Sequence, residues 1–489
     1  MRSRASVAWL WLALSAAATA VGLSAGQGAA ATFSSSPANT ADWTQFQGSA
    51  SHPGSPAASS LRVPLKRLWW FREPNGHVGL SGAVVLGGTV ITVGDHGVYG
   101  LEAASGEMRW RIPRADGSPI VMPAVGRVKQ RDVLVYTEGR RDDASAIVAV
   151  DPADRHELWR EPLKAVSRTG VTIDGDLVAV GDREGRLYAY DLATGKPESW
   201  SPKTIGGGAI AVAPASAGGD VFVVAQNGST GEVKVSAVDS TTGGQRWEFS
   251  PRLAAGTGSG VLVRNGRAYF GLGNEQRVHA LTADDGVEVW ATRTRSSFSP
   301  LASPAYADGR LYMTSTSAGD AALYSLDAAD GGRNWDFQFQ DASILSSPVV
   351  VGNIVYVGLD DGRVAGIDVG RGVEVWEDHT GPGQIGPLAV SGDELIASKR
   401  GRGGGLIAFG PNPGGRLLDI QSPSDLRLGH VLIDYAIALA AVLVVVVGAA
   451  RGLRVVVGPP GAREPPPEGV PAASETTEGE PSAESGEED

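Results

Sequence analysis

The residue types best suited to catalysis are scattered along this chain of 489 residues. Its seven histidines show no His-x-His or HExxH spacing, which would point to a zinc site. The pair Asp360 and Asp361 could ligate a cation, but acids in a tight turn are better explained by hydrogen bonds to its amides. Cysteine is absent, which excludes thiolate metal sites, cysteine nucleophiles and disulfides. The sequence therefore points to no catalytic, metal-binding or cofactor-binding residue.

Basic side chains in the connections between repeated segments form a candidate binding face instead. Connections of this kind carry binding residues in many scaffolds, and positive charge would suit an acidic partner or a cell-wall polymer. Scattered, solvated loop charges are the alternative interpretation. With a formal net charge of −12 and no basic stripe, we expect no nucleic-acid partner. The candidate binding residues are Arg72, His77, Arg114, Lys164, Arg168, Arg293, Arg295 and His379.

A repeat that ends in tryptophan would position these connections. Its clearest copy reads AVDSTTGGQRW at 237–247, and successive copies end 41 to 49 residues apart. This period, with short β-rich runs, is typical of one four-stranded propeller blade. The Asp can accept hydrogen bonds in a turn, the glycine permits a positive φ angle, and the Trp can pack on the next blade. The predicted structural docking residues are Trp70, Trp110, Trp159, Trp200, Trp247, Trp290, Trp335 and Trp376, with Asp151, Asp191, Asp239, Asp327 and Asp368.

Seven complete copies leave the pieces of an eighth blade at the two ends of the array. Three further strands are expected after Trp376, at 386–390, 394–399 and 405–409, and one before the first copy, at 68–71. We therefore predict an all-β, eight-bladed β-propeller whose last blade is shared between the two ends. Seven blades are the alternative if the terminal strands do not pair.

The segments outside the repeats predict a membrane protein. Residues 1–31 have the charged start, apolar middle and small-residue end of a signal peptide, although an uncleaved anchor is also possible. A linker and lead-in at 32–60 precede the propeller at 61–412, and a juxtamembrane linker follows at 413–430. The apolar run at 431–450 is long enough for a transmembrane helix.

Charge next to the apolar run predicts its orientation. Arg451 and Arg454 follow the run directly, which favours a cytoplasmic C-terminus. The tail at 451–489 carries nine acidic and three basic residues and should be disordered. We expect a single-pass protein of the cell membrane with its propeller outside the cytoplasm.

The pattern A-x-D-x-x-x-G-x-x-x-W resembles the docking motif of pyrroloquinoline-quinone-type (PQQ-like) propeller repeats. The stretch at 42–48, followed by His52 and Gly54, also resembles the usual start of such propellers, so the resemblance covers roughly 42–412. The family that this motif resembles has two large branches. Quinoprotein dehydrogenases hold the quinone on the propeller axis with a calcium ion. Non-enzymatic members include the propeller lipoprotein of the outer-membrane protein assembly machinery.

The residues favour the non-enzymatic branch. The resemblance to dehydrogenases implies an adjacent cysteine pair, which this chain lacks, and the expected inner strands are almost free of the acids that calcium and a catalytic base need. We expect no cofactor and no enzyme activity, and a protein partner at the cell envelope for which the propeller is a scaffold or assembly factor. A quinone-dependent dehydrogenase and a glycan- or ligand-binding sensor ectodomain are the alternatives.

Overall fold

The computed structural model describes residues 42–415, except 57, 75–78, 116, 140–144, 207, 252–255, 296, 299–301, 317–319, 345 and 402. The predicted signal peptide, transmembrane helix and acidic tail lie outside the described residues. Within the described part of the chain, no helix is long and apolar enough to cross a membrane.

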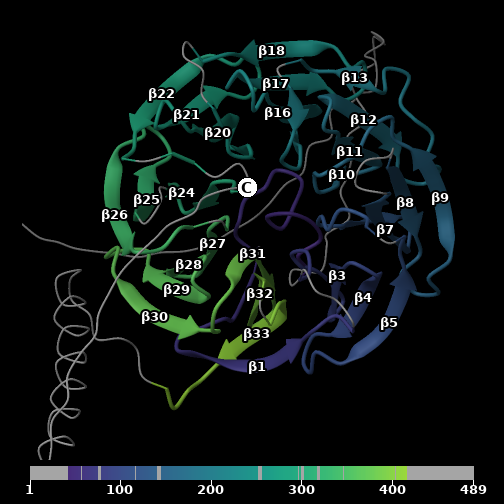
Figure 1. The fold of residues 1–489 in the computed structure, drawn as a ribbon. Helices are drawn as coiled ribbons and strands as arrows, with labels where there is room; N and C mark the ends of the chain where they lie inside the picture. The colour runs from purple at the N-terminus through teal and green to yellow at the C-terminus, as the bar shows by residue number, and fades with distance from the viewer. Residues whose placement is uncertain are drawn as a thin grey trace, which may run out of the picture. The chain divides into compact units, whose positions relative to one another are not determined.

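Eight antiparallel sheets follow one another around a ring (Figure 1), so the prediction of eight blades is confirmed. In seven of the sheets the chain runs from the axis outward without interruption. Blade 1 contains β2 (Val84–Leu86), β3 (Thr89–Val93), β4 (Gly97–Glu102) and β5 (Met108–Pro113). Blade 2 contains β6 (Ala124–Val128), β7 (Arg131–Glu138), β8 (Ala146–Val150) and β9 (Glu157–Pro162). Blade 3 contains β10 (Thr172–Asp174), β11 (Leu177–Gly181), β12 (Arg186–Asp191) and β13 (Lys203–Thr204).

The next four blades repeat this order, with one extra inner strand in blade 4. Blade 4 contains β14 (Ala209–Ile210), β15 (Ala215–Ala217), β16 (Asp220–Gln226), β17 (Val233–Asp239) and β18 (Gln245–Phe249). Blade 5 contains β19 (Leu262–Arg264), β20 (Arg267–Leu272), β21 (Arg277–Thr282) and β22 (Glu288–Arg293). Blade 6 contains β23 (Ala305–Ala307), β24 (Arg310–Ser315), β25 (Asp320–Asp327) and β26 (Arg333–Gln340). Blade 7 contains β27 (Val349–Val351), β28 (Ile354–Gly358), β29 (Arg363–Asp368) and β30 (Glu374–His379).

Blade 8 joins the two ends of the described chain. Its inner strands are β31 (Gln384–Ser391), β32 (Glu394–Arg400) and β33 (Gly405–Pro411), and its outer strand is β1 (Leu65–Phe71). β1 pairs antiparallel with β33, as the sequence predicts, and a bulge interrupts the register between Arg67 and Trp69. This pairing closes the ring because the first and last strands of the array share one sheet.

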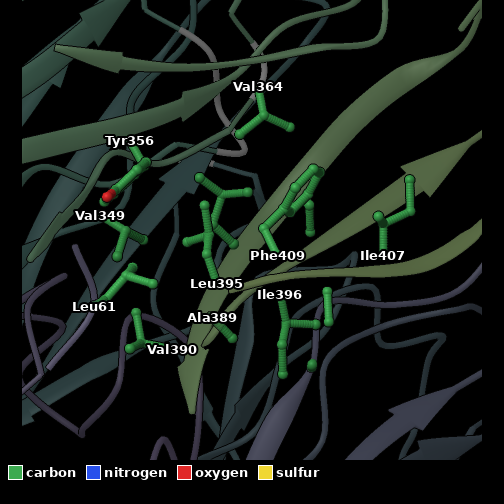
Figure 2. Packing of buried hydrophobic residues seen from close by; sticks show 14 of the residues in the cluster. Leu61, Val349, Tyr356, Val364, Ala389, Val390, Leu395, Ile396, Ile407 and Phe409 are labelled. Atoms are coloured by element: carbon green, nitrogen blue, oxygen red, sulfur yellow. The ribbon is translucent and has the colours of Figure 1, made fainter. Parts of the chain in front are cut away.

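The middle strands of the blades are buried on both faces. All five residues of β28 are buried, and four consecutive residues of β11 are as well. Both faces of a blade pack on neighbouring blades, so every position needs an apolar or small side chain. Figure 2 shows this packing in blades 7 and 8, where Tyr356 and Val364 lie near Leu395 and Phe409.

Tryptophans in or just before the outer strands connect successive blades. Trp247 donates its indole N–H to Ala283 O at 2.7 Å, and its ring lies directly over Gly286 of the next blade. Its own hairpin is held by Asp239, whose Oδ1 accepts hydrogen bonds from the Thr241 and Thr242 amides. Indole–carbonyl bonds of the same kind are made by Trp159, Trp200, Trp290, Trp335 and Trp376.

Two predicted docking tryptophans are placed differently. In blade 8 the docking position belongs to Trp69, which donates to Ala103 O at 2.6 Å, and not to Trp70. The bulge in β1 shifts the register by one residue, so Trp70 lies instead beside Arg72 and Lys399. Trp110 lies over Gly100 of its own blade.

The hairpin after Trp110 explains this second difference. It carries Arg155 at φ 67° where other copies have glycine. In other copies, such as Gly243 and Gly286, a Cβ at this position would meet the docking indole, so a residue larger than glycine leaves no room for the ring. The docking contact therefore depends on a glycine in the following blade as much as on the tryptophan itself.

Candidate functional site

Residues 42–59, here called the axial segment, run through the middle of the ring (Figure 1) and contact the inner strands of the blades in chain order. Trp43 and Val85 of blade 1 exchange two backbone hydrogen bonds. Thr44 O accepts from the Val125 amide of blade 2. The side-chain amide of Gln45 both donates to and accepts from the backbone of Ile173 in blade 3.

The contacts continue around the other blades. Backbone carbonyls of Ala50, Ser51, Pro53 and Gly54 accept hydrogen bonds from Ser216, Val263, Tyr306 and Val350, in blades 4 to 7. The hydroxyl of Ser59 then donates to Gly392 O in blade 8 at 2.6 Å. The axial segment therefore belongs to the packed propeller, which includes residues 42–60 as well as 61–412. It closes the mouth of the ring on the side of the turns between the first two strands of the blades.

His52 belongs to the axial segment. It is fully buried, its Nδ1 is 3.1 Å from Val261 O, and its ring meets Phe46 edge-on. Burial lowers the pKa of His52 to about 4, so the imidazole is neutral at physiological pH and donates from Nδ1. These contacts give His52 a structural role in holding the axial segment.

A cavity of about 130 Å³, here called the axial cavity, opens at the other mouth of the ring. Its walls come from the residues just before the inner strands of blades 1 to 4 and from β31, and Phe46 of the axial segment contributes to the lining. Most of the surface is apolar, formed by Ile120, Val121, Met122, Val212 and Pro387 among others. The cavity is of the same order as one that holds benzene in an engineered protein, about 150 Å³.

Two arginines add positive charge to this cavity. Arg168 lies in the connection from blade 2 to blade 3 and is exposed, whereas Arg400 ends β32 and is partly buried. The described residues give neither guanidinium a hydrogen bond or an ion pair, and no carboxylate is among the described lining residues. Burial lowers the pKa of Arg400, and no neighbouring charge offsets that effect.

The candidate binding residues do not form one cluster. Of the seven that the structure describes, only Arg168 lines the axial cavity. Arg114 is buried and donates to Gly94 O, Pro119 O and Thr137 O, so it links blade 1 to blade 2. Arg72 lies over the Trp70 ring at 4.4 Å.

The others are spread around the rim. Lys164 and Arg293 are exposed. Arg295 lies 3.9 Å from Asp336, and exposed His379 lies 3.5 Å from Glu377. His77 is outside the described residues. Sequence reasoning missed Arg400, because it considered only the connections between blades, whereas this residue ends the second strand of its blade. In a propeller, the connections between blades and the turns between the second and third strands of each blade lie at the same mouth. Including those turns among the candidates would have identified Arg400.

The described residues contain one group of acids and histidine that could share a metal ion: Asp151, Asp154 and His156. These residues form a turn of blade 2. Asp151 accepts a hydrogen bond from the Ala153 amide and pairs with Arg131, and Asp154 pairs with His156. Each carboxylate therefore has a structural explanation within the hairpin.

Comparisons with known proteins place this geometry in a family. The family described as outer membrane protein assembly factor BamB matches residues 143–233 and 229–385. The chain belongs to the PQQ-like β-propeller repeat family. Curated relatives of this PQQ-like propeller include the quinohemoprotein alcohol dehydrogenase of Comamonas testosteroni, 29% identical over 149 residues, and the ADH IIB enzyme of Pseudomonas putida, 40% identical over 84 residues.

These relatives match only in part. The alignments span 27% and 15% of this chain, and 21% and 12% of the two enzymes. Among solved structures, the Comamonas enzyme has a TM-score of 0.60 at 13% identity, covering 79% of this chain and 83% of that chain. A europium-containing methanol dehydrogenase has a TM-score of 0.59 at 14% identity, covering 75% of this chain and 91% of that one. Likeness at this identity shows the shared propeller fold alone.

The axial cavity of this PQQ-like propeller does not fit a calcium-bound quinone. Calcium takes six to eight oxygen ligands, mostly from carboxylates, carbonyls and amides. The described lining offers two polar side chains without charge, Ser81 and Gln384, and the Ser81 hydroxyl already donates to Gly82 O. No step of quinone chemistry can be assigned to residues of this kind.

Proposed function

We propose that this protein is a membrane-anchored, extracytoplasmic propeller that binds a protein partner as a scaffold or assembly factor at the cell envelope. The observation that carries the proposal is the chemistry of the ring axis. One mouth is closed by the axial segment, and the described lining of the other mouth holds two arginines but no carboxylate. Such a lining suits recognition of a ligand rather than its chemical conversion, because it offers no general base.

The membrane part of the proposal is supported by sequence pattern. The apolar run at 431–450 and the basic residues after it favour a propeller outside the cytoplasm and a short tail inside. The match to the BamB family supports a role in binding other proteins, since that family is described as an assembly factor.

Site-specific photo-crosslinking in cells tests the scaffold role. Crosslinkers at Lys164 and Arg293 report on the open mouth, and crosslinkers at Asp176 and Asp284 report on the opposite face; all four side chains are exposed. We expect one defined protein adduct from the first pair and none from the second. Equal labelling from both faces, or no adduct from either, would refute a partner docked at the open mouth.

A quinone-dependent dehydrogenase is the second candidate, because both curated relatives are quinohemoprotein alcohol dehydrogenases. The purified protein can be mixed with pyrroloquinoline quinone and calcium, and then assayed for dye reduction with alcohols. We expect no turnover. Saturable quinone binding accompanied by turnover would overturn the scaffold proposal.

A further inference from the structure

We propose that the axial cavity binds the carboxylate of a ligand that also carries a small apolar group, without a metal ion. The inference rests on the proposed function, in which the propeller binds and does not convert its ligand. Two sources share this chemistry, a small organic acid and the C-terminal residue of a peptide, and they are separated below by experiment.

The charge of the cavity favours an anionic ligand. A partly buried guanidinium without a counter-charge is unfavourable, because desolvation is not offset by an ion pair. Arg400 is in this situation, since the described residues provide no hydrogen bond to its side chain and only burial acts on its pKa. Arg168 lines the same cavity, and it also lacks a partner among the described residues. A carboxylate is the ligand that a guanidinium recognises best, through two parallel hydrogen bonds.

The shape and polarity of the cavity favour a small apolar group. Apart from the two arginines, Ser81 and Gln384, the described lining is apolar or glycine, with side chains such as Phe46, Met122 and Val212. Apolar cavities near 150 Å³ hold a molecule the size of benzene. The cavity of about 130 Å³ therefore suits a branched aliphatic or aromatic group of about this size. A highly charged or sugar-like ligand would leave polar groups unpaired against these walls.

The axial segment limits access to the cavity. The axial segment closes the opposite mouth, and Phe46 from this segment lines the cavity. The cavity is therefore a pocket with one opening and not a channel through the ring. The carboxylate would pair with the two arginines, and the apolar group would contact Phe46, Met122 and Val212.

Calorimetric titration of the purified full-length chain tests the site directly. The first arm uses 4-methylpentanoate and benzoate, with the corresponding amides as neutral controls. The second arm uses a short peptide that ends in leucine, with either a free or an amidated C-terminus. We expect binding in at least one arm, only by the carboxylate form, and unchanged by a metal chelator. Absence of carboxylate binding in both arms, or equal binding of the neutral forms, would overturn the proposal.

Variants connect binding to the cavity. Arg400→Gln and Arg168→Gln should each weaken carboxylate binding about 10- to 100-fold, the effect of losing a charge-assisted hydrogen bond. Arg183→Gln is the matched control, because Arg183 is exposed in the neighbouring loop of blade 3 and does not line the cavity. Equal effects of all three variants, or none, would contradict the assignment.

Two further measurements guard against variants that fail to fold. Ala211→Leu retains both arginines but fills the edge of the cavity, so it should abolish binding. Without ligand, Arg400→Gln should raise the thermal unfolding midpoint, because it removes an uncompensated charge. An Ala211→Leu variant that binds normally would refute the location. If carboxylate binding fails while the photo-crosslinks at the open mouth persist, the inference is wrong and the scaffold proposal survives.

Discussion

Glu374, at the start of β30, provides the sharpest test of the electrostatics of the fold. Its side chain is 3% exposed, and Oε1 has no hydrogen-bond partner among the described residues. Burial raises the pKa of Glu374 to about 8, and the charge of Glu377 acts in the same direction. The folded protein therefore keeps a proton on Glu374 at neutral pH, whereas the unfolded chain, with a pKa near 4.5, has released it.

The direction of the pH effect follows from proton linkage. Because the folded state binds this proton more tightly, its contribution to stability is complete below pH 4.5 and is lost as the pH rises to about 8. At about 1.4 kcal/mol per pKa unit, the loss over the whole window is roughly 5 kcal/mol. His52 acts in the opposite direction, since its lowered pKa makes stability fall as the pH drops from 6.5 toward 4. The interval from pH 6.5 to pH 8 therefore isolates Glu374 from His52.

The perturbation is Glu374→Gln, which is neutral at every pH. Urea unfolding of the wild-type protein and the variant should be compared at pH 6.5 and at pH 8. The stability of the variant relative to wild type should increase by about 1.5 kcal/mol between these conditions. The change with pH is the readout, because the cost of burying the new amide is nearly the same at both pH values and cancels.

The control is Glu107→Gln, in an exposed hairpin of blade 1, which should leave the pH dependence unchanged. If the stability of Glu374→Gln relative to wild type is the same at both pH values, the raised pKa of Glu374 in the folded protein is refuted. That result would mean that the folded protein ionises Glu374 as readily as the unfolded chain does.

Three other pairs of substitutions, each a test variant with a matched control, test the packing through urea unfolding. Trp376→Ala should lower the free energy of unfolding by about 3–5 kcal/mol, because the buried indole joins blade 7 to Leu65 O, whereas Trp70→Ala, outside the docking position, should cost clearly less. Gly331→Ala should lower the free energy of unfolding by about 1–3 kcal/mol more than Gly309→Ala. Both glycines have positive φ angles, but only a Cβ at Gly331 would meet an indole ring. Equal losses of stability would count against the docking contact. Arg114→Met should cost about 3 kcal/mol or more because three backbone carbonyls lose their donor, while exposed Arg183→Met should change stability by less than about 0.5 kcal/mol.

Blade number and ring closure were predictable from sequence because the contacts that define a blade repeat along the chain. The Asp239 turn lies within one copy of the motif, and the Trp247 contact with Gly286 spans one period. Each copy of the motif therefore contains the residues that specify its own blade. The fourth strand of blade 8 could also be found, because its tryptophan-rich segment lacks a motif in front of it.

Details of individual blades were less predictable. A one-residue bulge in β1 exchanges the roles of Trp69 and Trp70, and a bulge depends on pairing with β33, more than 300 residues away. Arg114 was predicted to be an exposed binding residue, yet it is buried and donates hydrogen bonds to backbone carbonyls of two blades. The axial segment looked like a lead-in, but its hydrogen bonds reach all eight blades.

By itself, the sequence determined that this chain forms an eight-bladed ring closed by its own ends, because periodic local contacts specify the repeat and its count. It also excluded thiol chemistry, since no cysteine is present. Only the tertiary structure decided which side chains face the axis. Arg168 and Arg400 are 232 positions apart in the chain and line one cavity solely because the ring closes. No periodic pattern encodes that proximity, so the candidate site emerges only from the folded ring.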